Sequence, residues 1–272
     1  MRGPARAAPR LALYLGWTLL LLPLQIVAVL FGLALAERLP LVYHRGVCRI
    51  LGLNVERRGA MSAARPTLFV CNHTSYIDVE VLGAIIAGSF VAKREVASWP
   101  LFGLLAKLQR SVFVERRAHR TGEQRDAMTE RLETGDNLIV FPEGTSNDGN
   151  RVLPFKSALF GVAERRINGA ALIVQPVSIA YAGLDGMPMP RHMRPFFAWY
   201  GDMELASHLW HMLGVGAATV VVEFHPPVTI EGFGTRKALS SHCQAVIAAG
   251  VSAAIHGTAP RRPSAGTAGP AA

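Results

Sequence analysis

The N-terminal part of the chain contains a long stretch without a single charged residue, at positions 11–36. One continuous helix over this range would be roughly 39 Å long, which exceeds the bilayer hydrocarbon core of about 30 Å. A chain of this kind must keep one long apolar segment in contact with lipid or cover it with protein. Because Pro23 interrupts the stretch, the sequence allows either one spanning helix or a bent helix pair that enters one leaflet.

Arginines flank this stretch on both sides, so charge alone does not orient it in a membrane. A cleaved signal peptide is an alternative, supported by the basic start and by Ala34-Leu35-Ala36. Its apolar region would, however, exceed the usual length of about 7 to 15 residues. Residues 40–51 combine apolar and basic positions, which is typical of an amphipathic helix at a lipid interface or of a solvated helix end.

Composition narrows the classes of partner. Half of the residues are hydrophobic and 17% are charged, and the formal net charge is +9, where soluble domains carry about 25% charged residues. A basic chain suits an acidic membrane surface, an acidic carrier protein or nucleic acid. The sequence has no zinc-ligand spacing and no basic stripe with interleaved aromatics, which disfavours nucleic acid. The three cysteines form no C-x-x-C pair and are expected to be reduced, buried thiols.

Beyond residue 52 the pattern alternates between strands and helices. Short apolar runs predict strands at residues 53–57, 67–71, 90–93, 111–114, 137–141, 172–181 and 219–224. Helical spacing occurs at residues 79–86, 99–108, 122–133 and 155–165. We therefore expect an α/β domain with a mixed sheet flanked by helices over residues 53–257, after a membrane anchor and amphipathic segment at 1–52. Residues 258–272 are rich in Ala, Pro and Gly and are expected to be disordered.

The first motif with chemical content follows the predicted strand 67–71. His73 comes directly after that strand, and Asp78 lies five residues later at the start of a helical run. If His73 is in the turn and Asp78 in the first helical turn, the carboxylate can fold back onto the imidazole, as general-base catalysis on an alcohol requires. The alternative is structural, because Ser75 and Asp78 also fit a capping box.

Two further strand ends carry polar residues. Pro142-Glu143-Gly144-Thr145-Ser146 breaks out of an apolar strand, so its amides and hydroxyls could surround a polar ligand, although an ordinary turn has the same composition. The second strand leads into Arg116 and Arg117, a cationic pair able to bind phosphate or carboxylate. Solvated arginines are the alternative interpretation of that pair.

In this order, the segments resemble the glycerolipid acyltransferase family typified by bacterial 1-acylglycerol-3-phosphate acyltransferase, over roughly residues 53–228. The Asn72-His73-x4-Asp78 segment matches the H-x4-D block of that family, and Phe141-Pro142-Glu143-Gly144-Thr145 follows about seventy residues later. Residues 113–116 match the block that contacts the glycerol-phosphate headgroup. Residues 174–177 match the fourth block, in which Pro176 shapes the acceptor side.

The resemblance implies a reaction. His73 would remove a proton from a lysolipid hydroxyl, which would attack the thioester of acyl carrier protein or coenzyme A without a covalent acyl-enzyme, while Asp78 holds His73. Amides around residues 143–145 are candidates to stabilise the oxyanion. No cofactor and no metal are expected. The remaining expected substrate-binding residues are Arg116, Glu143, Gly144, Thr145, Ser146 and Pro176. Because these thioesters are cytosolic, the catalytic domain would face the cytoplasm from the inner membrane.

Two departures from the family pattern affect the acceptor. Family members usually carry arginine directly after Glu-Gly-Thr, and this chain has Ser146; the glycine that usually opens the headgroup block is Arg110. Either Arg116, with Arg110, Arg117 or Lys156, supplies the missing charge, or the acceptor is not a glycerol phosphate. Residues 145–156 resemble the subgroup that acylates lyso-ornithine lipid. The expected acceptor is lysophosphatidic acid, with lyso-ornithine lipid as an almost equally supported alternative. An enzyme that uses both acceptors is a further alternative.

Two other classes of function remain open. A thioester or ester hydrolase would pass the acyl group to water, but it would usually carry a G-x-S-x-G serine, which this sequence lacks. A non-catalytic membrane adaptor would account for the apolar segment and the basic charge. It would leave the ordered polar blocks without a role.

Overall fold

The computed structural model describes residues 3–114 and 121–257. The α-helices are α1 (Pro4–Leu30), α2 (Leu35–Leu51), α3 (Ile77–Gly83), α4 (Phe102–Leu108), α5 (Thr121–Glu133), α6 (Leu205–Gly214) and α7 (Arg236–His256). The 3-10 helices are η1 (Arg94–Ser98), η3 (Ser157–Glu164), η4 (Arg191–Phe196) and η5 (Ile230–Gly232). The strands are β1 (Leu53–Arg58), β2 (Thr67–Cys71), β3 (Ser89–Lys93), β4 (Val112–Val114), β5 (Leu138–Val140), β6 (Arg166–Ile167), β7 (Ala170–Ala171), β8 (Ile173–Leu184), β9 (Met187–Pro188) and β10 (Ala218–Phe224).

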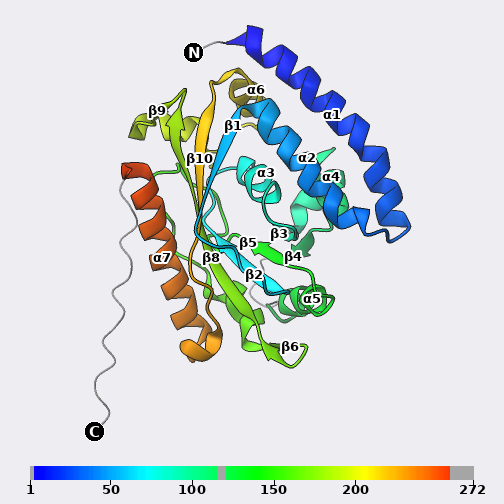
Figure 1. Cartoon of the computed structure of the whole chain (residues 1–272), viewed down its shortest axis with the longest axis vertical. Helices are drawn as coiled ribbons and strands as arrows, with labels where there is room; N and C mark the ends of the chain where they lie inside the picture. The colour runs from blue at the N-terminus through cyan, green and yellow to red at the C-terminus, as the bar shows by residue number, and fades with distance from the viewer. Residues whose placement is uncertain (1–2, 115–120, 258–272) are drawn as a thin grey trace.

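The N-terminal stretch forms a helix pair. Figure 1 shows α1 and α2 side by side along one edge of the molecule, joined by a short connection in which Gly32 has a φ of +60°. Pro23 lies inside α1 without ending it. Trp17 donates its indole N–H to the Tyr43 carbonyl (3.0 Å), and its ring occupies the space that a Cβ at Gly46 would need. The bend expected at Pro23 is absent, because α1 runs through that residue and the chain turns back only after Leu30. Whether α1 spans the bilayer or enters one leaflet stays a prediction.

Among the helices of residues 3–114 and 121–257, two are long and apolar enough to cross a membrane, α1 and α7. They differ in their surroundings, because α7 packs against β8 and is the more buried of the two. Much of α1 is exposed, and its exposed large side chains include Leu13, Leu19, Leu20, Leu24 and Leu30. An uncovered leucine face of this size on a helix indicates association with a membrane.

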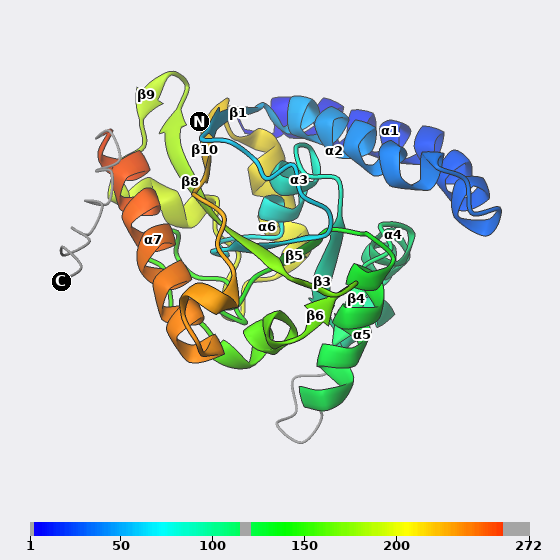
Figure 2. The same cartoon turned by 60° about the horizontal axis from the view of Figure 1, so that its bottom comes forward.

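Within the described residues, eight strands form one mixed sheet in the order β1-β10-β8-β2-β5-β3-β4, with β9 paired to β8. Strand β2 runs parallel to both β5 and β8, and β8 runs antiparallel to β10. Figure 2 shows α7 on one side of the sheet and the α1–α2 pair on the other. The predicted α/β class with a mixed, helix-flanked sheet is confirmed.

The core has two halves, one on each face of the sheet. Along β2, Phe69 and Cys71 pack into one half, while Leu68 and Val70 pack into the other. A strand with both faces buried is apolar throughout, which explains the unbroken run that marked it in the sequence. All three cysteines are free and buried, as expected.

Some elements differ from those predicted from the sequence. The predicted helix at residues 155–165 is a 3-10 helix, η3, and β8 extends to Leu184, three residues past the predicted end. The sequence analysis identified neither α6 nor α7. Both helices pack against the rest of the fold, and tertiary packing stabilises such segments more than local periodicity does. The predicted disorder of residues 258–272 lies outside the described residues.

Candidate active site

The polar motifs meet at one edge of the sheet. Strands β2 and β5 are parallel neighbours, and their last residues, Cys71 and Val140, lie at the same edge. The chain turns out of each strand directly into a polar segment, at His73 and at Glu143. Carboxyl ends of parallel strands form a crevice where ligands commonly bind. The parallel pairing of β2 with β5 therefore brings together two motifs that are seventy residues apart in the sequence.

His73 is held on three sides. Its Nδ1 lies 2.9 Å from Asp78 Oδ2, its ring stacks on Phe141 at 4.2 Å between centroids, and its backbone N–H donates to Glu143 (2.7 Å). Because a carboxylate only accepts, Nδ1 carries the hydrogen and Nε2 is left as the basic nitrogen. His73 also lines a cavity, with 22% of its side chain exposed. This arrangement presents a basic nitrogen to the cavity.

Asp78 has no exposed surface and is surrounded by donors. Its Oδ2 also accepts the backbone N–H groups of Thr74 (2.6 Å) and Ser75 (2.9 Å), and its Oδ1 accepts the Tyr181 hydroxyl (2.8 Å). The expected turn and first-helical-turn placement of His73 and Asp78 is therefore observed. The bond to the Ser75 N–H is one half of a capping box, but the Ser75 hydroxyl has no partner. Asp78 thus both caps α3 and fixes the imidazole.

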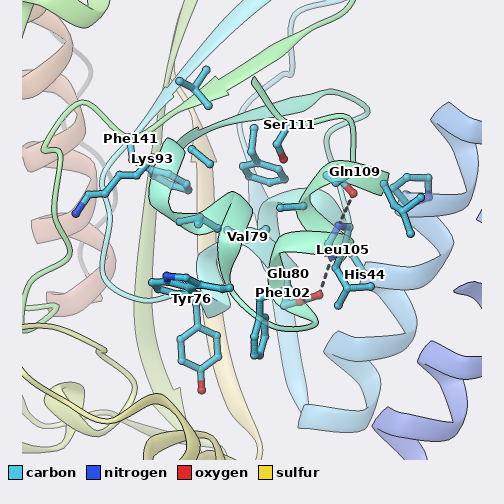
Figure 3. Close-up of a pocket in the computed structure, with 18 of the residues that line it drawn as sticks. His44, Tyr76, Val79, Glu80, Lys93, Phe102, Leu105, Gln109, Ser111 and Phe141 are labelled. Atoms are coloured by element: carbon cyan, nitrogen blue, oxygen red, sulfur yellow. Dashed lines mark hydrogen bonds and ion pairs between the residues drawn. The ribbon is translucent and has the colours of Figure 1, made fainter. Parts of the chain in front are cut away.

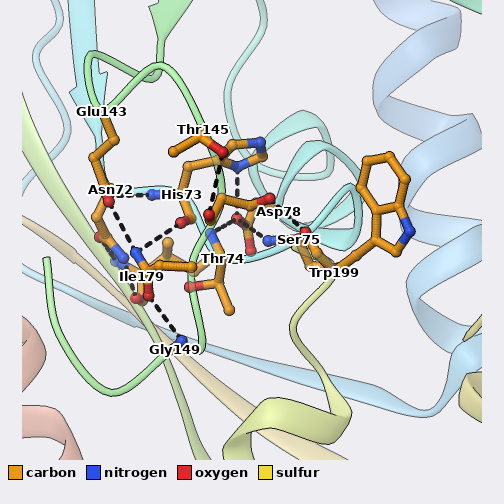
Figure 4. A network of polar contacts seen from close by, with 12 residues as sticks. Asn72, His73, Thr74, Ser75, Asp78, Glu143, Thr145, Gly149, Ile179 and Trp199 are labelled. Atoms are coloured by element: carbon orange, nitrogen blue, oxygen red, sulfur yellow. Dashed lines mark hydrogen bonds and ion pairs between the residues drawn. The ribbon is translucent and has the colours of Figure 1, made fainter. Parts of the chain in front are cut away.

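Glu143 lies behind His73 and does not line the cavity. Its carboxylate accepts the backbone N–H of His73, the N–H of Leu153 (2.9 Å) and the amide of Asn147 (2.8 Å). Asn147 also donates to the His73 carbonyl (3.1 Å). Figure 4 shows Glu143 beside the backbone of His73 rather than beside the ring. With 3% of its surface exposed, Glu143 positions the turn that carries His73.

The buried state of Glu143 leads to a prediction about stability and pH. Burial raises the pKa of Glu143 from 4.5 to about 7, although its three donors oppose the rise. Between these pH values the folded protein binds more protons at this site than the unfolded chain does. The free energy of unfolding is therefore expected to fall as the pH rises from about 4.5 to about 7.

Thermal unfolding in detergent, measured over this pH range, tests the expectation by comparing wild type with Glu143→Gln. The variant cannot titrate at this position, so its midpoint should lose this component of the pH dependence. Parallel pH curves for the two proteins would contradict the assignment.

The residues after Glu143 do border the cavity. Gly144 has a φ of +76°, a backbone conformation that favours glycine, and the Lys156 side chain lies against the space that a Cβ there would occupy. Thr145 is exposed, and the Ser146 hydroxyl donates to the Trp199 carbonyl. Trp199 in turn donates its backbone N–H to the Thr74 carbonyl (3.1 Å). Ser146 therefore tethers the Trp199 loop to the edge of the site.

The cavity has a volume of about 560 Å³. His73, Gly144, Thr145 and Ser146 lie along part of its wall, and apolar side chains of α3, α4 and β3 line much of the rest. Figure 3 shows Val79, Phe102, Leu105 and Phe141 among the side chains around it. An apolar cavity of this volume with a few polar groups is typical of a site for a small or lipid-like ligand.

The N-terminal helices also line this cavity, a contribution that was not predicted from the sequence. They supply Tyr14, Thr18, Leu21, Leu22, Gln25, Leu39, Pro40, Tyr43 and His44. Polar residues inside the uncharged stretch, such as Thr18 and Gln25, are the one signal that could have indicated it, because a purely lipid-facing helix has no need of them. The predicted anchor is therefore also a wall of the site.

Two predicted residues, Arg110 and Pro176, lie away from the cavity. The Arg110 guanidinium donates to both carboxylate oxygens of Asp136 (2.6 and 2.7 Å) and to Glu37 (3.4 Å). It is therefore not available as a source of charge for the headgroup. Pro176 lies buried within β8 beside Val70 and is not among the residues around the cavity. Arg116 lies outside the described residues. The headgroup contact expected of Arg116 and the role of Pro176 in shaping the acceptor side stay predictions.

Among residues 3–114 and 121–257, no group of three or more histidine, cysteine or acidic side chains is placed to hold a metal ion. Near His73, the polar groups that line the cavity include the imidazole that Asp78 binds and the side chains of Thr145 and Ser146. Such a set can move a proton and bind an oxygen atom.

Comparisons with known proteins agree with this geometry. The model of the Acyltransferase family matches residues 52–180. The chain is 43% identical to a lyso-ornithine lipid O-acyltransferase of Brucella abortus over 88% of this chain and 91% of that protein, and 33% identical to a 1-acyl-sn-glycerol-3-phosphate acyltransferase of Neisseria meningitidis over 66% and 68%. The crystal structure of a 1-acyl-sn-glycerophosphate acyltransferase from Thermotoga maritima shares the fold, with a TM-score of 0.59, 22% identity, and coverage of 91% of this chain and 96% of that one.

The family model contains the segments that carry His73, Asp78 and Glu143, and the relatives extend over most of the chain. The chain belongs to the acyltransferase family and is an acyltransferase.

Proposed function

We propose that the enzyme transfers a fatty acyl group from a thioester of acyl carrier protein or coenzyme A to the free hydroxyl of lyso-ornithine lipid. The observation that carries the proposal is the orientation of His73, whose Nδ1 binds a fully buried carboxylate and whose ring borders an apolar cavity. No hydrogen bond from the described residues occupies Nε2. A lysolipid hydroxyl that enters the cavity would meet a basic nitrogen already in the required tautomer.

The reaction would then proceed in two proton transfers. His73 Nε2 takes the hydroxyl proton while the oxygen attacks the thioester carbonyl, and Asp78 stabilises the imidazolium. The tetrahedral intermediate collapses, the carbon–sulfur bond breaks, and the thiolate takes the proton from His73. The products are an ester and a free thiol. The low polarity of the cavity would favour the lipid hydroxyl over water as the attacking group.

The oxyanion requires a donor near residues 143–146. The N–H of Gly144 already bonds the Phe141 carbonyl (3.2 Å), which removes it as a free donor in this conformation. The hydroxyl of Thr145 makes only a long contact, to the Ser146 carbonyl at 3.3 Å. We assign Thr145, as an exposed side chain at the cavity edge, the oxyanion contact.

Two observations favour an ornithine headgroup over a phosphate. The arginine that usually follows Glu-Gly-Thr is Ser146, whose hydroxyl is occupied by Trp199, and Arg110 is occupied by Asp136. Lys93 and Glu95 both line the cavity, so charges of both signs are present, as a headgroup with an ammonium and a carboxylate would need. The similarity to the Brucella abortus protein supports the same acceptor.

The acceptor preference is expected to shift when Ser146 is changed to arginine. A guanidinium at the cavity edge can bind a phosphate through charge-assisted hydrogen bonds. Ser146→Arg should therefore raise the ratio of kcat/KM for lysophosphatidic acid to that for lyso-ornithine lipid by about tenfold or more. The assay uses membranes with the protein, a labelled acyl-carrier-protein thioester and each acceptor in turn.

Ser146→Gln is the matched control, because it also removes the bond to Trp199 but adds no charge. If the wild type forms product only with lyso-ornithine lipid, that lipid is the acceptor. Product with both acceptors would indicate a dual enzyme. Product with lysophosphatidic acid alone would overturn the proposed acceptor.

We also propose how the chain is arranged at the membrane. Residues 1–52 would anchor the protein through α1 and α2, and residues 53–257 would form the acyltransferase domain on the cytoplasmic side of the inner membrane, where both thioesters occur. The exposed leucines of α1 support the anchor. Because the helix pair also lines the cavity, a lipid chain could enter without crossing water.

A further inference from the structure

A carboxylate lies in the wall of the otherwise largely apolar cavity. Glu80 follows the catalytic pair on α3 and lines the cavity, and 18% of its side chain is exposed. Its neighbours around the cavity include Val79, Phe102 and Leu105. An ionised group beside apolar surface is costly unless it is paired. Glu80 takes no part in the proton transfers that are assigned to His73 and Asp78.

Glu80 is paired with His44 of α2. Their Oε2 and Nδ1 atoms are 2.7 Å apart, and His44 Nε2 lies 3.0 Å from Gln109 Oε1. Gln109 donates its amide to the Gly88 carbonyl (3.3 Å), which leaves its oxygen for His44. Both ring nitrogens thus face acceptors and act as donors, so the ring is an imidazolium. Figure 3 shows Gln109, His44 and Glu80 linked in this order.

The protonation of His44 also fits its surroundings. Burial by itself would lower the pKa of His44, but the Glu80 carboxylate and the two hydrogen bonds outweigh burial and raise it. The ring packs over Gly83 of α3, where a Cβ would collide with it. The buried imidazolium is therefore the partner that pairs with the Glu80 carboxylate in the cavity wall.

Only one oxygen of Glu80 is used by this pair. Within the described residues, the hydrogen bond to His44 involves Oε2, so Oε1 retains its lone pairs for a donor from the cavity. The wall of the cavity also carries the hydroxyls of Tyr14, Thr18 and Tyr43, which bond one another at 3.3 Å. The cavity therefore has a polar patch made of an acceptor carboxylate and three hydroxyls, within walls that are otherwise mainly apolar.

We propose that Glu80 is a recognition site for a hydroxyl group on the fatty chain in this cavity. The inference rests on the proposed function, which brings a fatty chain there. A hydroxyl on that chain would donate to Oε1 in a charge-assisted hydrogen bond, whereas a plain chain would leave the carboxylate facing methylene groups. The hydroxylated chain could belong to the acyl donor or to the lysolipid itself. Glu80 would thus determine which chains the enzyme prefers.

The test compares matched chains on one preparation of the full-length protein in membranes. One arm varies the donor, using a hexadecanoyl thioester and hexadecanoyl thioesters with one hydroxyl near the carbonyl, at the middle or near the methyl end. The other arm keeps the plain donor and places the extra hydroxyl on the chain of the lysolipid. Wild type, Glu80→Leu and Glu80→Gln are compared, with the exposed Glu56→Gln as control.

The expected result is a reversal of preference. Wild type should favour one hydroxylated chain, and Glu80→Leu should lower the ratio of kcat/KM for that chain to kcat/KM for the plain chain about tenfold or more. Glu80→Gln should give an intermediate ratio, because an amide oxygen accepts without charge. The arm in which the ratio changes identifies whether the chain comes from the donor or the lysolipid. Because each ratio is taken on one preparation, a variant that folds poorly still gives a valid result.

Two results would overturn the inference. If both chains are transferred and the ratio is the same in wild type and Glu80→Leu, then the His44–Glu80 pair only joins α2 to α3, and the proposed function still stands. If wild type transfers neither chain to any lysolipid, the proposed function fails and the inference fails with it.

Discussion

Replacing His73 with alanine is expected to lower kcat for acyl transfer about 100- to 10,000-fold, the range that a positioned general base contributes. The change removes the nitrogen that would accept the hydroxyl proton. It should leave the fold largely intact, because the backbone N–H of residue 73 still bonds Glu143 and its carbonyl still accepts from Asn147. The packing contact that is lost is the stack of the His73 ring on Phe141, at the cavity edge.

The measurement is single-turnover transfer of a labelled acyl chain to lyso-ornithine lipid by wild type and His73→Ala. His211→Ala is the matched control, since this exposed histidine of α6 lies away from the cavity. The thermal midpoints of all three proteins should be similar. Equal rates in wild type and His73→Ala would remove His73 from the mechanism.

The second large effect is expected for Asp78→Asn. The asparagine has nearly the same shape but no charge, and its amide N–H₂ would face one of the groups that now donate to the carboxylate: His73, Thr74, Ser75 or Tyr181. The imidazole would lose both its fixed tautomer and the charge that stabilises its protonated form. We expect kcat to fall about 100- to 10,000-fold and the free energy of unfolding to fall by about 1–3 kcal/mol.

Tyr181→Phe separates these two effects. It removes one donor from Asp78 Oδ1 but keeps the charge and the bond to His73. Its unfolding free energy should fall by about 1 kcal/mol, with a much smaller loss of kcat than in Asp78→Asn. Comparable losses of kcat in the two variants would mean that packing around Asp78, rather than its charge at His73, limits the reaction.

The sequence predicted the part of the site that depends on neighbouring strands. His73 and Glu143 each follow a short, fully buried strand, and two such strands in a parallel sheet bring their ends together. The relation between His73 and Asp78 was equally local, because it depends on five residues of turn and helix. Both predictions rest on backbone geometry that a short sequence specifies.

The rest depended on tertiary contacts that no short segment specifies. Glu143 was expected to contact substrate. In the structure its carboxylate accepts from His73, seventy residues away, and from Asn147 and Leu153 in its own loop. Arg110 was one of several candidates to supply charge to the headgroup, but Asp136 binds it away from the cavity. His44 and Glu80 are 36 positions apart, and no local sequence pattern around either residue predicts their hydrogen bond.

The most direct test of the account follows the thioester itself. Purified protein in lipid or detergent receives a labelled acyl-carrier-protein thioester, and free thiol, fatty acid and diacylated lipid are measured with and without lyso-ornithine lipid. The account predicts that thiol appears only when the lysolipid is present and in equal amount to the new ester. Thiol and fatty acid released without lysolipid would indicate a hydrolase, and no thiol under either condition, with folded protein and intact donor, would contradict acyl transfer to this lysolipid altogether.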